Sequence, residues 1–338
     1  MEFDEQVVRL EGLQDIADRF VRVRVTNMAG VNLNLFKFDY DLTFMVFFLN
    51  ADEHIYGRYG GRDEKDADAR QSLAGLKYAM KAALESHDSY RPKPNAKKPQ
   101  FKSVRDYSRR TRGCVHCHQA KEMIYDDLKR KGQWSRDLLW RHPLPDNLGM
   151  NLEVDRGNVV QNVKGNSSAS AAGLRSGDVI RMLGETPVHS IGDAQHALDL
   201  APRKGSLSIA YKRDGKLIKS ILELKDGWRR SPIDWRGSMR DQIPSARVYG
   251  RDLNTNERKK YGLQPKQLAF WQGYPVNAHA KAAGVSEGDI ILGFDDRILE
   301  LEAYDFLSYV RRNYLVGDRV TVNVIRDGKR IELKMNLK

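Results

Sequence analysis

The most constraining feature of this sequence is an internal repeat in its second half. The string A-G-L-R-S-G-D-V-I at 172–180 returns 111 residues later, at 283–291, as A-G-V-S-E-G-D-I-I. A second string, R-D-G-K at 213–216, returns 113 residues later at 326–329. Solenoid repeats have periods of about 20–50 residues, so this much longer period indicates two tandem domains of one fold.

Each copy has the same predicted secondary structure. The Gly-Asp turn leads into a short apolar run that predicts a buried strand. A helix with apolar residues at helical spacing is expected next, over 193–200 and over 303–311. Alternating runs then flank Asp214-Gly215 and Asp327-Gly328. This arrangement is typical of a β-hairpin, because glycine accepts a positive φ.

The two repeated strings resemble the PDZ family in its bacterial form, over 144–226 and 257–338. The resemblance implies that a peptide strand or C-terminus adds to a sheet edge beside a helix, where a glycine-containing loop binds its carboxylate or carbonyl. In the first copy the matching loop residues are Leu148, Gly149 and Met150. In the second copy they are Tyr261, Gly262 and Leu263.

The sequence favours binding over hydrolysis for these modules. Bacterial PDZ pairs often follow a serine protease domain, but no G-x-S-x-G string occurs in this chain. Ser167, in a Gly-Asn-Ser string, is predicted to be a loop residue of the first copy. We therefore expect protein or peptide partners at the grooves. The alternative is that one or both grooves are closed and the modules act as spacers.

The two cysteines of the chain stand in one C-x-x-C-H string, at 114–118. Such a string is typical of haem c attachment, in which each thiol adds to a haem vinyl group and the histidine ligates the iron. We therefore predict haem c at Cys114, Cys117 and His118, with His118 as the metal ligand. Candidates for the sixth iron ligand are His116, Met123, His142 and Met150.

Three other interpretations of this string stay open. A helix is predicted over 121–129, and a dithiol at its start would exchange disulfides, with Cys114 as nucleophile and Cys117 as resolving thiol. Zinc binding with His116 or His118 is a second possibility, although the chain has no other cysteine pair. The third is an inert pair in a plain PDZ scaffold.

The first 90 residues resemble the later half of the thioredoxin-like fold, with its front end missing. The alternation at 20–25 predicts a strand, the apolar run at 44–49 a buried strand, and 72–87 an amphipathic helix. The cysteine pair and the cis-proline of that family have no counterpart at the expected places. The expected role of this domain is structural or in docking.

Much of the positive charge lies in one segment. The chain has a formal net charge of +12, and residues 91–113 contain nine Lys and Arg residues against one acid. Few aromatic residues interleave these charges, as a base-stacking surface would require. The segment is therefore interpreted as a basic linker and nucleic acid is not expected as a partner.

The predicted organisation is that of a multi-domain α+β protein. Its parts are a thioredoxin-like domain (1–90), a basic linker (91–113), a helical C-x-x-C-H segment (114–143), PDZ-like domain 1 (144–226), a linker (227–256) and PDZ-like domain 2 (257–338). No apolar stretch reaches the roughly 20 residues that a transmembrane helix needs.

These parts together predict an extracytoplasmic, redox-associated scaffold that binds proteins through its PDZ modules. The location follows from the cofactor, because haem c is attached outside the cytoplasm in bacteria. The first twenty residues hold no continuous apolar core, so no signal peptide is recognised.

Overall fold

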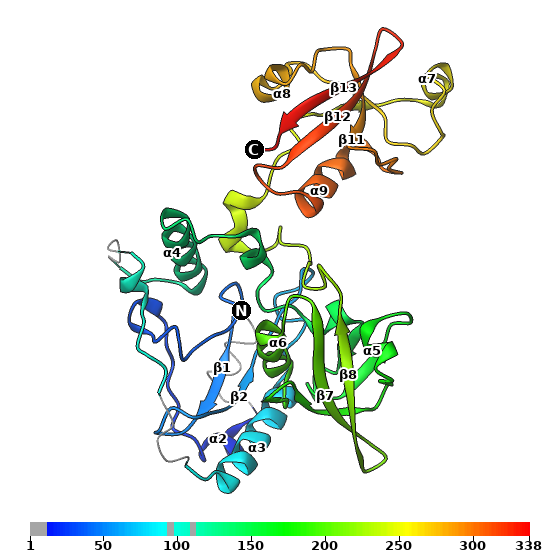
Figure 1. Cartoon of the computed structure of the whole chain (residues 1–338). Helices are drawn as coiled ribbons and strands as arrows, with labels where there is room; N and C mark the ends of the chain where they lie inside the picture. The colour runs from blue at the N-terminus through cyan, green and yellow to red at the C-terminus, as the bar shows by residue number, and fades with distance from the viewer. Residues whose placement is uncertain (1–11, 93–97, 109–112) are drawn as a thin grey trace. The chain divides into compact units, whose positions relative to one another are not determined.

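The computed structural model describes residues 12–92, 98–108 and 113–338 (Figure 1). The protein is multi-domain α+β, as predicted, and divides into two compact units, Met1–Ser231 and Pro232–Lys338. Within the described residues, no helix combines the length and the apolar character needed to cross a bilayer.

The N-terminal part of the first unit is a β-hairpin packed on a long helix. Its elements are α2 (Gln14–Ala17), η1 (Met28–Gly30), β1 (Val46–Leu49), β2 (Ile55–Tyr59) and α3 (Leu73–Ser89). The strands pair antiparallel, and Ser72 caps α3 by accepting a hydrogen bond from Gly75 N–H (2.9 Å). The apolar stripe of α3 packs on the hairpin, with Leu76 and Met80 in one core with Phe48.

This region differs from the thioredoxin-like prediction at the expected first strand. Residues 20–25 form no β-strand, and Val21 and Val23 are 96% and 80% exposed. An alternating sequence becomes a strand only where a neighbour supplies backbone hydrogen bonds. Among the described residues, no strand pairs with this segment. The sheet here has two strands, and the thioredoxin-like fold is not confirmed.

The segment around the cysteines packs on residues near Met28. It contains η2 (Val104–Asp106), α4 (Cys117–Arg130) and η3 (Arg136–Trp140). The helix predicted after the C-x-x-C string is present, and Gln119 Oε1 accepts a hydrogen bond from His116 N–H (3.0 Å) at its first turn. Ala120 is buried in a cluster with Met28 and Val104. Parts of the predicted basic linker, 93–97 and 109–112, lie outside the described residues.

The first repeat copy forms two sheets around one core. Its elements are η4 (Pro145–Leu148), β3 (Met150–Leu152), β4 (Val160–Val163), α5 (Ser168–Ala171), β5 (Val179–Leu183), β6 (Thr186–Pro187), α6 (Ile191–Leu200), β7 (Gly205–Arg213) and β8 (Lys216–Leu224). β3 pairs with β4, and the larger sheet has the order β6-β5-β7-β8. The predicted hairpin at Asp214-Gly215 joins β7 to β8, with positive φ at both residues.

The second copy has a similar element order in a single five-stranded sheet, with helix α7 added after its first strand and, among the described residues, no strand that matches β6. Its elements are β9 (Gly250–Asp252), α7 (Thr255–Lys260), β10 (Phe270–Gln272), α8 (Ala278–Ala282), β11 (Ile290–Phe294), α9 (Ala303–Asn313), β12 (Arg319–Arg326) and β13 (Lys329–Asn336). The strand order is β13-β12-β11-β10-β9. β9 lies before 257, so this module begins earlier than the predicted boundary.

An arginine–aspartate pair explains why the two sequence strings recur together. The Arg213 guanidinium, at the hairpin, donates to both carboxylate oxygens of Asp178 (2.7 Å each) and to the carbonyl of Gly173 (2.7 Å). Arg326 makes the same three bonds in the second copy, to Asp289 and to the matching glycine. The R-D-G-K and A-G…G-D strings are therefore two halves of one bidentate contact.

The predicted linker at 227–256 is largely packed rather than extended. Trp228 is buried in the first unit, where its indole N–H donates to the carbonyl of Pro202 (3.1 Å). In the second unit, η5 (Gly237–Gln242) precedes Ser245, whose N–H donates to the carbonyl of Lys338 (2.9 Å). The connection between the units is therefore short.

Candidate peptide-binding site

The predicted loop of the first copy lies at the start of β3. Leu148 ends η4, Met150 begins β3, and both side chains are buried in the core of the module. Gly149 between them has a φ of 83°, and its N–H donates to the carbonyl of Asp146 (2.9 Å). The Gly149 carbonyl accepts a hydrogen bond from Lys164 N–H (2.8 Å), so both backbone groups of this glycine have partners inside the module.

The predicted loop of the second copy lies elsewhere. Tyr261 caps the C-terminal end of α7, Gly262 follows it, and Leu263 is buried in a cluster with Ala269 and Ile290. These residues stand in the segment between β9 and β10, not before the first strand of the module. Tyr261, Gly262 and Leu263 are thus not the structural counterparts of the first loop.

Arg247 occupies the position in the second copy that Gly149 occupies in the first. Its φ is 59°, and it lies between Ala246 and Val248, which are buried in the module core just as the flanking residues are in the first copy. The sequence does not reveal this position, because the PDZ pattern marks the loop by a glycine. A lone arginine gives no signal for a left-handed backbone.

The helix beside each loop differs sharply between the copies. In α6, eight of ten residues are buried, whereas in α9 only Ala303, Phe306 and Val310 are buried among eleven. Tyr304 of α9 is 80% exposed. A one-sided helix leaves a face free, so the helix of the second module is open on one side while α6 is covered nearly all round.

Two carboxylates of α6, those of Asp193 and Asp199, are buried against polar groups from other parts of the first unit. Asp193 lies 3.8 Å from the guanidinium of Arg58, yet burial raises the pKa of the Asp193 carboxyl to about 7. Asp199 accepts hydrogen bonds from the Arg141 guanidinium and, at 3.1 Å, from His142 N–H. Burial opposes ionisation of Asp199, but His142 and Arg141 outweigh it and hold the pKa of this carboxyl below its usual range.

The cysteines of the C-x-x-C-H string differ in environment. Cys114 is exposed and Cys117 is partly buried, and both are free thiols. Burial raises the pKa of the Cys117 thiol, and Cys117 packs against the cluster of Val104 and Ala120. The His118 ring is exposed, with Nδ1 3.4 Å from Glu122.

The four candidates for the sixth ligand divide into two pairs. The His116 ring stacks on that of His118 (ring centroids 6.1 Å apart), and Met123 packs against the same cluster as Cys117, whereas His142 and Met150 are buried elsewhere. Met150 is fully buried in the first PDZ core, and His142 is buried beside Asp199. Across the part of the chain that the structure describes, no group of three or more His, Cys, Asp and Glu side chains is arranged to hold a metal ion. The zinc interpretation therefore gains no support.

Ser167 has a structural position, as predicted. It is the N-cap of α5: its hydroxyl accepts a hydrogen bond from Ser170 N–H (3.1 Å) and donates one to the carbonyl of Lys164 (2.6 Å).

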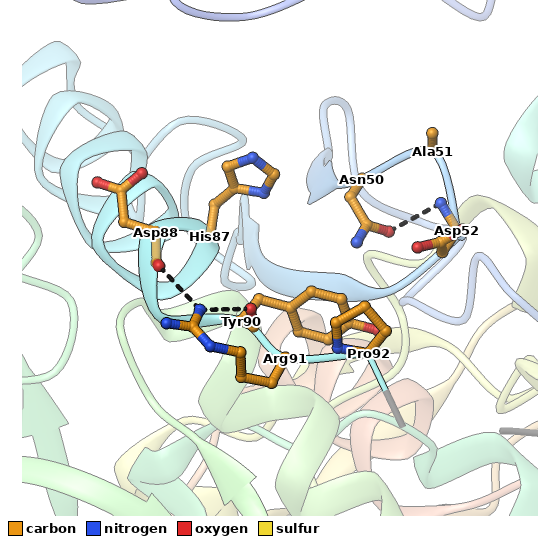
Figure 2. Close-up of a pocket in the computed structure, with 8 residues that line it drawn as sticks. All are labelled: Asn50, Ala51, Asp52, His87, Asp88, Tyr90, Arg91 and Pro92. Atoms are coloured by element: carbon orange, nitrogen blue, oxygen red, sulfur yellow. Dashed lines mark hydrogen bonds between the residues drawn. The ribbon is translucent and has the colours of Figure 1, made fainter. Parts of the chain in front are cut away.

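A surface pocket lies between the turn that joins β1 to β2 and the C-terminal end of α3, and Figure 2 shows its lining residues. They are Asn50, Ala51, Asp52, His87, Asp88, Tyr90, Arg91 and Pro92. None of the predicted site residues lines it.

Comparison with known proteins identifies one of the two modules. Residues 147–224 match the PDZ domain family and form a PDZ domain. The chain is 28% identical over 144 residues to the periplasmic serine endoprotease DegP of Salmonella typhimurium, covering 43% of this chain and 27% of that protein. DegP of Escherichia coli K12 is 27% identical over 155 residues, covering 45% and 29%. This chain thus spans less than a third of the length of these relatives.

One further sequence relative belongs to the same group of proteins. The serine protease Do-like HtrA of Lactococcus lactis subsp. cremoris is 41% identical over 71 residues, covering 21% of this chain and 17% of that protein. Among solved structures, an HtrA-type protease with a decapeptide overlaps 53% of each chain at 14% identity and a TM-score of 0.26.

These findings correct the predicted function. The expectation of a redox-associated scaffold, with thiol–disulfide exchange as its alternative, is wrong, because the relatives that match are serine proteases of the DegP and HtrA type. A plain PDZ scaffold agrees with them only in part. These matches do not show a thioredoxin-like domain or a haem-binding C-x-x-C-H segment.

Proposed function

We propose that this chain is a protease-associated PDZ protein that recruits polypeptide segments outside the cytoplasm. One observation carries this proposal: the PDZ domain at 147–224 lies in a chain whose relatives are DegP and HtrA proteases. The DegP relatives are named as periplasmic, which supports the location. Strand addition at a sheet edge would supply affinity through main-chain hydrogen bonds, and side-chain pockets would supply specificity.

The second module supports peptide recruitment by its geometry. Its helix α9 buries one face only, and β9 is the edge strand of the five-stranded sheet. An edge strand with unused backbone donors and acceptors is the surface to which a peptide strand adds. The Asp252 carboxylate accepts hydrogen bonds from Ala303 N–H (3.0 and 3.2 Å), which ties the first turn of α9 to this strand.

Two measurements test the proposal. A fluorescein-labelled pool of decapeptides with four random C-terminal residues should show a saturable rise in anisotropy with the full chain, and a C-terminally amidated pool should bind more weakly. Size-exclusion chromatography of the chain with an HtrA-type protease from the same organism should show co-elution. Absence of binding to both pools would rule out peptide recruitment, and separate elution would rule out stable association with the protease.

Haem c attachment at Cys114, Cys117 and His118 stays a separate prediction, which peptide recruitment does not require. Cys114 and His118 are exposed, whereas Cys117 is partly buried against a hydrophobic cluster, so the Cys117 thiol is the less accessible of the two. Protein from an export-competent host should show an absorption band near the Soret region, which a Cys114→Ser/Cys117→Ser variant should lack. A wild-type spectrum without this band would contradict the prediction.

A further inference from the structure

The first PDZ groove is covered by residues from the N-terminal part of the same unit. The end of β2 meets the start of α6 (Figure 1), where Arg58 N–H donates to Asp193 Oδ1 (2.8 Å) and the Ser190 hydroxyl donates to the carbonyl of Arg58. The approach is close: a Cβ added to Gly192 would lie 3.3 Å from the carbonyl oxygen of Gly60. The backbone at 58–60 therefore lies directly on the first turn of α6.

The next residues continue along the same helix. A Cβ on Gly61 would lie 3.5 Å from Ile191 Cγ2, 3.6 Å from Gln195 Oε1 and 3.2 Å from Arg70 Cβ. Gly61 is thus held between α6 and Arg70. Gln71 Nε2 donates to the carbonyl of Gly61 (2.9 Å), which ties the two ends of the segment together.

The other side of the segment contacts η4. The Arg70 guanidinium lies 2.7 Å from Asp146 Oδ1, and the same carboxylate accepts a hydrogen bond from the Asn151 side chain in β3. Just beyond the segment, Ser72 donates to Asp155 (2.6 Å), three residues after β3. Residues 58–71, hereafter the lid segment, therefore bridge α6 and η4, the short helix that leads into β3.

This bridge crosses the space that a peptide would need. Strand addition requires access to the edge of β3 beside α6. The described backbone hydrogen bonds include none between the lid segment and β3, so the segment does not extend the sheet. It blocks the groove through side chains and through the close approach of Gly60 and Gly61 to α6.

We propose that the lid segment is an autoinhibitory cover of the first PDZ groove, so that the second module recruits peptides while the first stays closed until the lid is displaced. This inference rests on the proposed peptide recruitment. The burial of eight residues in α6, against three in α9, is the expected signature of one covered and one open groove. Arg70 pairs with Asp63 inside the segment and with Asp146 of η4. A substitution of Arg70 should therefore weaken both the internal structure of the lid segment and its attachment to the PDZ domain.

Hydrogen–deuterium exchange of the full chain tests the lid without any ligand. Arg70→Glu places a third carboxylate beside Asp63 and Asp146, and exchange at 58–71 and at the first turn of α6 should rise about tenfold. Asp146→Ala cuts the contact from the other side and should have the same effect. Arg156→Glu, which disrupts an exposed pair with Glu153 in the same module, is the matched control. Exchange equal to wild type in both lid variants, or an equal rise in the control, would overturn the lid.

Photo-crosslinking with the random-C-terminus decapeptide pool, carrying an N-terminal benzophenone, then locates the open groove. In the wild type, cross-links should map to the second module only, and in Arg70→Glu to both modules. Wild-type cross-links at β3 or α6 would overturn the inference. If no variant cross-links in either module, peptide recruitment itself is wrong, while the exchange data still decide whether the lid exists.

Discussion

At the residue scale, the groove loop depends on one backbone conformation rather than on one residue type. Gly149 and Arg247 stand at matching positions with φ of 83° and 59°. Glycine adopts this region freely, whereas another L-residue there costs roughly 1–2 kcal/mol. A glycine marks the loop in the first copy. In the second copy the pattern is best matched at Gly262, and nothing in the sequence marks Arg247 as a residue with a left-handed backbone.

The conformation and close packing of Gly149 predict that its replacement by alanine lowers the stability of the module. In Gly149→Ala, the added Cβ would overlap the Cβ and hydroxyl of Ser167 in addition to its unfavourable φ. We expect the free energy of unfolding to fall by about 2 kcal/mol, measured by urea denaturation. Gly165→Ala in the same module is the control, since no atom lies within 4 Å of its added Cβ. Equal losses in the two variants would contradict this explanation.

A buried histidine predicts how stability depends on pH. Burial lowers the pKa of His142 to about 4, and Asp199 opposes this shift only in part. In the unfolded chain the pKa of this histidine is about 6.5, so between about pH 6.5 and pH 4 the unfolded state binds a proton that the folded state does not bind. The free energy of unfolding therefore falls as the pH drops through this range, by up to about 3 kcal/mol. Burial also lowers the pKa of His196, to about 3, with the same sign. The raised pKa of Asp193 acts in the opposite direction and reduces the net loss.

His142→Asn isolates the contribution of this imidazole. His142 has a φ of 55°, which asparagine tolerates better than most residues. Urea midpoints measured at pH 7 and pH 4.5 should differ less in the variant than in the wild type. An unchanged difference would show that His142 is not the group that titrates.

At the element scale, α4 is anchored by one buried lysine. Lys121 Nζ lies 2.8 Å from Asp41 Oδ2 and 3.4 Å from Asp39 Oδ1, and all three side chains are buried. Replacing Lys121 by Met leaves two buried carboxylates without this cation, which should cost about 3 kcal/mol. The loss is measured as the change in the free energy of unfolding in urea.

An exposed lysine near the same helix provides the control. Lys131 pairs with Asp127 at 2.6 Å but is 53% exposed, so Lys131→Met should cost less than about 1 kcal/mol. Comparable costs for the two variants would show that burial does not set the strength of the Lys121 contact. The sequence predicted the α4 helix because residues 121–129 contain no helix-breaking residue before Gly132. The anchor was missed because Asp39 and Asp41 lie some 80 positions away.

At the scale of the whole molecule, the two compact units predict two unfolding transitions. Each unit has its own core, and Phe294 is fully buried in that of the second. In Phe294→Ala, the transition of the second unit should lose about 3–5 kcal/mol while the other stays in place, as followed by scanning calorimetry. A joint shift of both transitions would indicate that the units unfold together.

The sequence by itself determined the tandem modules, because their signals are local. The A-G…G-D turn, the Asp-Gly hairpin and the apolar runs each specify a few neighbouring residues, and the recurring arginine–aspartate pair joins them. The strand expected at 20–25 failed because alternation supplies no pairing partner. Only the tertiary structure decided which groove is covered, since the contact between Arg58 and Asp193 joins residues 135 positions apart. Such a contact forms between two surfaces that are made from segments far apart in the sequence, and a pattern of neighbouring residues does not predict which surfaces come together.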